Sequence, residues 1–403
     1  MKIVIHTLAM KGGLIDMPKA RIAREIFRFA HPFFTTTPID QRAAIPGIGR
    51  RLSDFTKGRL HRVPESRRKG RMALSDIIGS SGEKEIEKAG IILFQAVGDS
   101  GRTPDSPEQV VSDMMAADFD VNQPARSPAF FLHLGDVIYG PNKEQSYRRE
   151  FYEPYMRYPG KIIAIPGNHD GETFPKTDPV PLKAFIQNFC ATTSKIPAIA
   201  GSIFRETMTL PGVYWLLETP FVDIVGLDSN SAENPGFISG PGPGNVQKRW
   251  LISTLEYVAG RRNRRSPKAL IMATHHPPFS QGGHSGSGEM LADIDDACRQ
   301  AGIYPDLFLS GHAHSYQRYA REMTVANVKK QIPFIVAGTG GVGEQQVPEA
   351  NGQHVGEATY EKSFKGYGFL LLKASRKSVE VEYFSVETAN GTRTSFDKIE
   401  VEI

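Results

Sequence analysis

The sequence predicts an α/β fold in which two stacked β-sheets are flanked by helices. Three observations indicate this class. From residue 91 onward, short apolar runs typical of buried strands alternate with stretches that have helical spacing. Each run ends in a polar cluster, as strands of α/β proteins often do. After residue 366 the sequence becomes rich in strand-like segments, and these extra strands favour two sheets over one.

Six apolar strand candidates are each followed by polar residues. They lie within residues 91–97, 129–136, 161–170, 221–230, 269–276 and 307–314. A helix is expected from Ser106, because Ser106 can cap it, Pro107 suits its first turn and Gln109 completes a capping-box spacing.

Two longer helices are expected over residues 245–259 and 288–302. In the second, four residues with helical spacing are assigned to the hydrophobic core: Met290, Leu291, Ile294 and Cys298.

The C-terminal part predicts three strands over residues 367–375, 378–388 and 397–403, with a turn at Asn390-Gly391. Residues 234–245 contain too much Gly and Pro for regular structure, so we expect a surface loop that rims a site.

Length and composition indicate a soluble globular protein. The chain has 403 residues, 40% of them hydrophobic, which is enough for one large core with or without an appended segment. No run approaches the roughly 20 apolar residues of a membrane span, and no secretion signal is visible, so we expect a cytoplasmic protein. Cys190 and Cys298 are far apart and predict neither a disulfide framework nor a thiolate metal site. Any metal must therefore take nitrogen and oxygen ligands.

The basic charge is concentrated at the N-terminus. Residues 1–90 contain 18 of the 48 Lys and Arg residues but only 9 of the 44 Asp and Glu residues, which leaves a net −5 for the remainder. We predict a basic N-terminal extension over residues 1–90 and a catalytic domain over 91–403, with the first core strand near Ile91. The extension is interpreted as a solvated or partly disordered arm; the alternative is contact with nucleic acid or anionic lipid.

Five short polar motifs follow the predicted strands. An isolated His-x-His pair is most often hydrogen-bonded to backbone, so no motif decides the function alone. Together the motifs supply carboxylates, an amide oxygen, a phenol and imidazoles. These residues are Asp99 in "GDSG", Asp136 and Tyr139 in "GDVIY", Asn168 and His169 in "GNHD", His275 and His276 in "THHPP", and His312 and His314 in "GHAH".

This mixture of donors indicates a transition-metal site. Nitrogen and oxygen ligands of these types suit Fe, Mn, Zn or Co, and they are too rich in nitrogen for Ca or Mg alone. With one carboxylate as a bridge they suffice for two ions. Two ions about 3.5–4 Å apart can generate a hydroxide nucleophile and neutralise a phosphoryl group.

The ordered motifs Asp-x-Gly, Gly-Asp-x-x-Tyr, Gly-Asn-His, His-x-Pro and Gly-His-x-His resemble the calcineurin-like metallophosphoesterase superfamily, and more specifically the purple acid phosphatases. The resemblance runs from about residue 91 to the end. It implies a two-sheet αββα sandwich and a centre with Fe(III) plus a divalent ion (Fe, Zn or Mn). The implied Fe(III) ligands are Asp99, Tyr139 and His314, Asp136 is the implied bridge, and the implied divalent ligands are Asn168, His275 and His312.

The resemblance also assigns roles to the remaining histidines. The His-x-Pro spacing selects His275, with Pro277, over His276. Small animal-type purple acid phosphatases carry a substrate-side histidine nine positions after this ligand, which corresponds to His284. The alternative for His284 is a solvated histidine in a Gly/Ser loop. His169 resembles the family's other non-ligand histidine, which contacts the phosphate or orients the nucleophile.

Tyr139 separates this chain from other members of the superfamily. Many nucleases and cyclic-nucleotide phosphodiesterases have Asp-x-His in the first motif and no tyrosine in the second, whereas this chain has Gly101 and Tyr139. A phenolate is a hard, charged ligand that favours a trivalent ion. The alternative is an aromatic ring that only packs beside the site.

The predicted function is a metal-dependent phosphatase of the purple acid phosphatase type, acting on small phosphoester substrates through a metal-bound hydroxide. His169 and His284 are its predicted catalytic residues. The alternatives are a phosphodiesterase acting on nucleotides or phospholipid head groups, and a non-catalytic scaffold. We expect no membrane span and no nucleic-acid partner.

Overall fold

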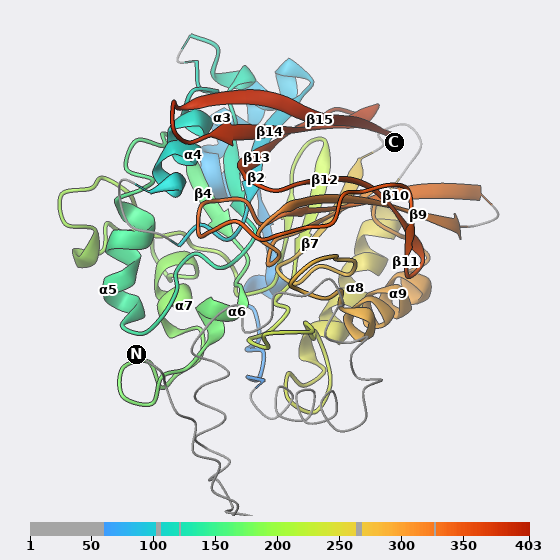
Figure 1. Ribbon diagram of the computed structural model, residues 1–403, viewed down its shortest axis with the longest axis horizontal. Helices are drawn as coiled ribbons and strands as arrows, with labels where there is room; N and C mark the ends of the chain where they lie inside the picture. Colours follow the sequence, from blue (N-terminus) through green and yellow to red (C-terminus); the bar gives the residue numbers. More distant parts are fainter. Residues whose placement is uncertain (1–59, 102–105, 121, 263–267, 326–327) are drawn as a thin grey trace, which may run out of the picture. The chain divides into compact units, whose positions relative to one another are not determined.

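The computed structural model describes residues 60–101, 106–120, 122–262, 268–325 and 328–403. Residues 1–59 of the predicted extension lie outside this described part of the chain. The strands form two sheets, and helices lie along their outer faces (Figure 1). The predicted α/β class with two sheets is confirmed.

The larger sheet has nine strands in the order β1-β5-β6-β7-β8-β10-β9-β12-β11. Strands β6, β7, β8 and β10 run parallel, and β9, β12 and β11 continue the sheet in antiparallel pairs. Its strands are β1 (Arg71–Ala73), β5 (Trp215–Glu218), β6 (Val222–Gly226), β7 (Ala269–Thr274), β8 (Leu307–Ser310), β9 (Tyr316–Val325), β10 (Val328–Ala337), β11 (His354–Val355) and β12 (Ala358–Phe364).

The smaller sheet has six strands in the order β15-β14-β13-β2-β3-β4. Strands β2, β3 and β4 are parallel, and β13, β14 and β15 are added in antiparallel order. The strands are β2 (Ile92–Val97), β3 (Phe130–His133), β4 (Lys161–Ala164), β13 (Tyr367–Ala374), β14 (Ser378–Glu387) and β15 (Thr392–Glu402). The two sheets pack against each other; for example, the ring of Tyr316 on β9 stacks on Tyr383 of β14 with centroids 4.0 Å apart.

Helices α8 and α9 pack side by side, while α4 contacts the smaller sheet at β13 and β14 (Figure 1). No helix in the described part of the chain is long and apolar enough to cross a membrane. The α-helices are α3 (Ser75–Ala89), α4 (Pro107–Ala116), α5 (Lys143–Tyr147), α6 (Asn168–Gly171), α7 (Lys183–Phe189), α8 (Val246–Arg261) and α9 (Gly288–Ala301).

Most predicted elements are confirmed. All six strand candidates contain a strand, both long helices are present, and the four residues assigned to the core of α9 are buried. Cys190 and Cys298 are free thiols. The predicted start of the helix is confirmed, because α4 begins at Pro107. The predicted cap is wrong, because the side chain of Ser106 makes no capping hydrogen bond. The last strand begins at Thr392, earlier than the predicted residue 397.

The first core strand also begins earlier than Ile91. Strand β1 pairs with β5 at the edge of the larger sheet, and Met72 and Leu74 are buried. Helix α3 follows and contributes Ile77 and Ile86 to the same core. The segment from residue 71 to residue 89 fell within the predicted extension, but it supplies a strand and a helix to the fold.

Candidate metal centre

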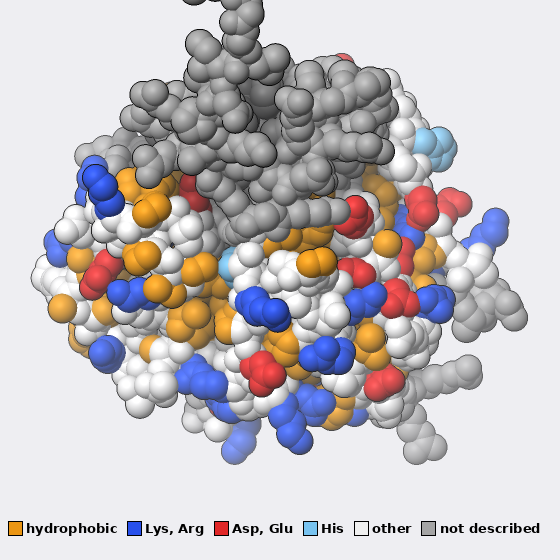
Figure 2. All heavy atoms as spheres, turned by 90° about the horizontal axis from the view of Figure 1, so that it is seen from below, with side chains coloured by type: hydrophobic (Ala, Val, Ile, Leu, Met, Phe, Trp, Pro, Cys, Tyr) orange, Lys and Arg blue, Asp and Glu red, His pale blue; other side chains and the backbone are white. Residues whose placement is uncertain are grey.

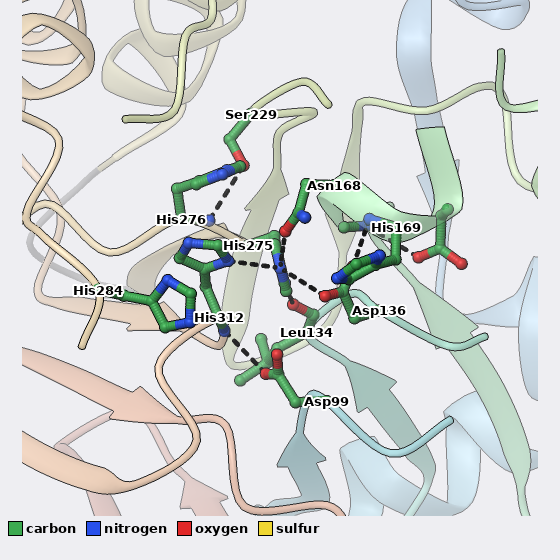
Figure 3. Close-up of polar contacts among 12 residues, drawn as sticks. Asp99, Leu134, Asp136, Asn168, His169, Ser229, His275, His276, His284 and His312 are labelled. Carbon is green, nitrogen blue, oxygen red and sulfur yellow. Dashed lines mark hydrogen bonds and ion pairs between the residues drawn. The ribbon is translucent and has the colours of Figure 1, made fainter. Parts of the chain in front are cut away.

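The carboxyl ends of strands from both sheets converge on one cluster of polar side chains (Figure 3). Asp99 and Asp136 follow β2 and β3 of the smaller sheet, and Asn168 follows β4. His275 and His312 follow β7 and β8 of the larger sheet. Parallel neighbours in a sheet bring their ends to the same edge, which is why these motifs meet although they are far apart in sequence.

Tight turns aim these side chains inward. Asp99, Asp136 and His312 have φ angles of 61°, 53° and 69°, which lie in the left-handed region that few residues adopt. The backbone at residue 167 lies directly against the side chain of Asp136. Only glycine fits there, since a Cβ atom on Gly167 would lie 2.1 Å from Oδ1 of Asp136. Backbone strain of this kind is typical of functional sites.

The imidazole of His275 lies at the centre of the cluster. Its Nδ1 donates a hydrogen bond to the carbonyl of Leu134 at 2.9 Å, so its Nε2 carries the lone pair in the neutral ring. This Nε2 lies 3.1 Å from Oδ1 of Asn168, 3.3 Å from Oδ2 of Asp136 and 3.3 Å from Nδ1 of His312. Ring orientation by a backbone carbonyl is characteristic of metal-ligating histidines.

His312 is oriented in the same way. Its Nε2 lies 3.2 Å from Oδ1 of Asn234 and donates to it, which leaves the lone pair on Nδ1 facing His275. Ligand atoms of Asp136, His275 and His312 lie within 4.8 Å of one another, and all three residues are buried. Lone pairs turned toward one another repel unless a cation or a proton lies between them, so these three residues form a possible metal site.

A second group of donors consists of Asp99, Tyr139 and His314. The Nε2 of His314 lies 3.4 Å from Oδ1 of Asp99, whose Oδ2 accepts a hydrogen bond from the backbone of His312 at 2.7 Å. The hydroxyl of Tyr139 is buried and has no hydrogen-bond partner in the described part of the chain. The hydroxyls of Tyr147, Tyr155 and Tyr383 are also buried without a partner among the described residues, so a role as metal ligand is supported by the position of the Tyr139 hydroxyl beside Asp136 and Asp99.

The ring of Tyr139 is held by packing. A Cβ atom on Gly101 would lie 2.2 Å from the ring, so the glycine of the Asp-x-Gly motif is needed to admit it. The ring centroid is 4.5 Å from that of His169 and 6.5 Å from that of His314. Burial, followed by the carboxylates of Asp136 and Asp99, raises the pKa of Tyr139 well above its usual value.

His169 lies beside the cluster as a potential cation. Its backbone donates to Oδ1 of Asp136 at 2.8 Å, and its Nδ1 lies 3.2 Å from Oε2 of Glu172. Burial alone would lower the pKa of His169, but Asp136 and then Glu172 outweigh burial and raise the pKa to about 9. Asp170 fixes this turn, because its Oδ2 accepts from the backbone of Gly167 at 2.9 Å.

His276 has no nitrogen left for a metal. Its Nε2 donates to the carbonyl of Ala232 at 2.8 Å, and its Nδ1 accepts from the hydroxyl of Ser229, also at 2.8 Å. Burial, followed by the charge of His275, lowers the pKa of His276 to about 3. The ring centroids of His276 and His312 lie 4.3 Å apart.

His284 is buried and faces the cluster (Figure 3). Its two ring nitrogens lie 2.9 Å from the side-chain amide of Asn234 and 2.8 Å from that of Gln345. Its centroid is 4.1 Å from that of His312. The alternative of a solvated histidine is therefore wrong.

Several residues of the site had no assignment from the sequence. Ser229, Asn234 and Gln345 hold His276, His284 and His312 through the contacts given above. The loop over residues 234–245 was expected to rim a site, and Asn234 is its first residue; however, Asn234 and Ile238 are buried, so the loop is not only a surface feature. No signal in the sequence pointed to Gln345.

Two carboxylates, an amide, a phenol and several imidazoles meet at these strand ends, and this set of ligands suits a metal-dependent hydrolase. The family model Metallophos, described as calcineurin-like phosphoesterase, matches residues 96–316, more than half of the chain. The chain belongs to the calcineurin-like phosphoesterase family.

Among solved structures, the chain is similar to PhoD, with 11% identity, a TM-score of 0.49, and coverage of 78% of this chain and 70% of PhoD. Vps29 from Entamoeba histolytica complexed with zinc has 9% identity, a TM-score of 0.28, and coverage of 77% and 99%. A phosphatase from Mycoplasma pneumoniae has 12% identity, a TM-score of 0.29, and coverage of 77% and 94%. The family assignment rests on the family model alone.

Proposed function

We propose that this protein is a dinuclear metal phosphomonoesterase of the purple acid phosphatase type. The observation that carries the proposal is the place of the buried Tyr139 hydroxyl, which interacts with the carboxylates of Asp136 and Asp99 and belongs to a ring that fits over Gly101. A phenol ligand favours Fe(III). Together with the lone pairs that meet at His275, it supports a site for two different ions.

The proposed ligands divide into two sets around a bridging Asp136. Asp99, Tyr139 and His314 would hold Fe(III), while Asn168, His275 and His312 would hold a divalent Fe, Zn or Mn ion. His312 and His314 would thus serve different ions. When bound, the ions would supply an activated water and neutralise charge on the phosphoryl group.

The protein's own residues would bind the substrate and move protons. His169, kept cationic by Asp136 and Glu172, would donate a hydrogen bond to a phosphoryl oxygen. His284, whose two ring nitrogens face the amide nitrogens of Asn234 and Gln345, would contact the phosphate or, with one ring nitrogen protonated, give that proton to the leaving alcohol. Because these side chains are buried, bulk water competes little with their contacts to the substrate.

The charge pattern on one face of the described part of the chain is compatible with a small substrate. On the described part of the face in Figure 2, basic and acidic side chains are interspersed rather than separated. A nucleic-acid substrate would favour a continuous basic stripe.

A phosphodiesterase is the second candidate, and one observation favours it. Oε2 of Glu172 lies 3.2 Å from Nδ1 of His169, whereas burial raises the pKa of the neighbouring Glu233 to about 8 and so keeps that group neutral at pH 7. The carboxylate of Glu172 repels a monoester dianion more than it repels a diester monoanion.

The test is metal analysis combined with two substrates. Protein purified without added metal should contain iron and two metal ions per chain, and it should hydrolyse an aryl phosphate faster than the matching bis-aryl phosphate. Equal or faster hydrolysis of the bis-ester would favour the phosphodiesterase. Protein that binds metal but hydrolyses neither ester would favour the scaffold, although all seven proposed ligands are present in the chain.

A further inference from the structure

Residues 60–73 precede the part of the chain that matches the family model, yet they form hydrogen bonds with residues of that part. The guanidinium of Arg67 donates to the carbonyls of Cys190 at 2.7 Å and Leu210 at 2.9 Å. Strand β1, at the end of this segment, pairs with β5. We call residues 60–73 the docking segment.

His61 is a buried residue of the docking segment. It is only 7% exposed. Its Nε2 donates to Oδ2 of Asp228 at 2.9 Å, and its Nδ1 lies 3.3 Å from the hydroxyl of Ser231. Its backbone exchanges two hydrogen bonds with the side chain of Asn230, at 3.0 and 2.9 Å. His61 therefore holds the loop over residues 228–231 by four contacts.

The same histidine packs against α6, the helix that begins with Asn168 and His169. A Cβ atom on Gly171, at the end of α6, would lie 3.1 Å from Cε1 of His61 and 3.1 Å from Cβ of Ser231. Glycine at this position allows the helix to lie directly on His61. His61 is thus in contact with α6 on one side and the 228–231 loop on the other.

The 228–231 loop in turn orients a histidine of the cluster. The hydroxyl of Ser229 accepts from the backbone of His276 at 3.0 Å and bonds its Nδ1 at 2.8 Å. The His276 ring packs on His312, which faces His275. A continuous chain of contacts therefore runs from His61 to both Asn168 and His312.

We infer that His61 is a positioning residue for the metal centre: it holds the 228–231 loop against α6 and so keeps Asn168 and His312 at the spacing that one ion requires. The inference rests on the proposed function, which assigns a shared divalent ion to these two residues. It also places the start of the working catalytic domain at or before residue 61, ahead of the family-matched region.

The test measures metal affinity, so it does not depend on turnover. Metal-stripped protein is titrated with Zn²⁺ in competition with a chromophoric chelator. His61→Ala should weaken one of the two binding steps by about 10–100-fold, as loss of a residue that supports metal ligands typically does, and change the other step little. His61→Gln should recover most of the affinity, because its amide can still donate to Asp228. His354→Ala, which removes an exposed histidine on β11, is the control and should bind as the wild type does.

Ser229→Ala provides a second route, because it leaves His61 in place and removes only the hydroxyl that orients His276. It should weaken the same binding step. The inference is overturned if wild-type protein binds two Zn²⁺ ions and His61→Ala binds both with unchanged affinity. It is also overturned if His61→Ala lacks a cooperative unfolding transition while Ser229→Ala binds Zn²⁺ normally. A wild type that binds no Zn²⁺ refutes the proposed function and this inference with it.

Discussion

Nε2 of His275 and Nδ1 of His312 lie 3.3 Å apart, and the other nitrogen of each ring donates a hydrogen bond away from this contact. Burial would lower the pKa of His275, but Asp136 and Asp99 raise it to about 9, so without metal a proton lies between these two nitrogens; when both rings are neutral, their lone pairs face each other. A shared cation removes the repulsion, and the carboxylate of Asp136 beside them adds the charge that such a cation needs.

This relationship predicts different results for two adjacent histidines. His275→Ala should lower the metal content from two ions to about one per chain, and activity should fall by more than the roughly 10–100-fold typical of residues that only support ligands. His276→Ala should retain more metal, because both nitrogens of His276 are bonded to Ser229 and Ala232. Elemental analysis of the two purified variants measures this difference. Equal loss of metal from both would contradict the ligand assignment.

A second prediction concerns acid stability. Burial, followed by the charge of His275, lowers the pKa of His133 from 6.5 to about 3. The unfolded chain therefore binds this proton at higher pH than the folded chain does. The stability that neutral His133 contributes is full above pH 6.5 and is lost as pH falls from 6.5 toward about 3, at roughly 1.4 kcal/mol per pH unit.

The measurement is the free energy of unfolding of metal-free protein between about pH 7 and pH 4. His133→Gln should show a flatter dependence on pH than the wild type. His354→Gln, which changes an exposed histidine, should follow the wild type. An identical slope in all three proteins would mean that His133 does not titrate differently in the folded chain.

A third prediction tests whether the docking segment is part of the folded core. Gly70 and Gly90 both have left-handed backbones, with φ angles of 69° and 76°. A Cβ atom on Gly70 would lie 2.4 Å from Nε1 of Trp250, which donates to the carbonyl of Lys69, whereas a Cβ atom on Gly90 meets open space. Gly70→Ala should therefore destabilise the protein by about 1–3 kcal/mol more than Gly90→Ala does. Chemical denaturation of both variants gives this difference, and equal stabilities would argue against tight docking.

The strand-end motifs could be predicted because each is local. An apolar run followed by a polar residue is visible in the sequence, and parallel strands bring such ends together. The antiparallel strands β9 and β12 were not predicted, because charged residues interrupt their apolar pattern. Arg321 on β9 is buried only through pairing with Asp295 at 2.8 Å and Glu357 at 3.0 Å. These partners lie on distant segments that the sequence does not connect.

The residues that support the site could not be predicted either, because their partners also lie on distant segments of the chain. His61 and Asn230 are separated by 169 residues, and Asn234 and His312 by 78. No periodicity links such pairs. The choice between His275 and His276 is another example, because the two residues have the same chemistry and differ only in which groups their nitrogens contact.

The central claim is that Tyr139 binds Fe(III), and the visible absorption spectrum tests it most directly. A tyrosinate bound to ferric iron transfers charge to the metal and absorbs visible light, so wild-type protein purified without added metal should be violet to pink. Tyr139→Phe keeps the ring that packs on Gly101 and His169 and removes only the hydroxyl. We predict that the colour disappears in Tyr139→Phe while iron remains bound through Asp99, Asp136 and His314. A colourless wild type that contains zinc or manganese and hydrolyses phosphoesters well would contradict the claim.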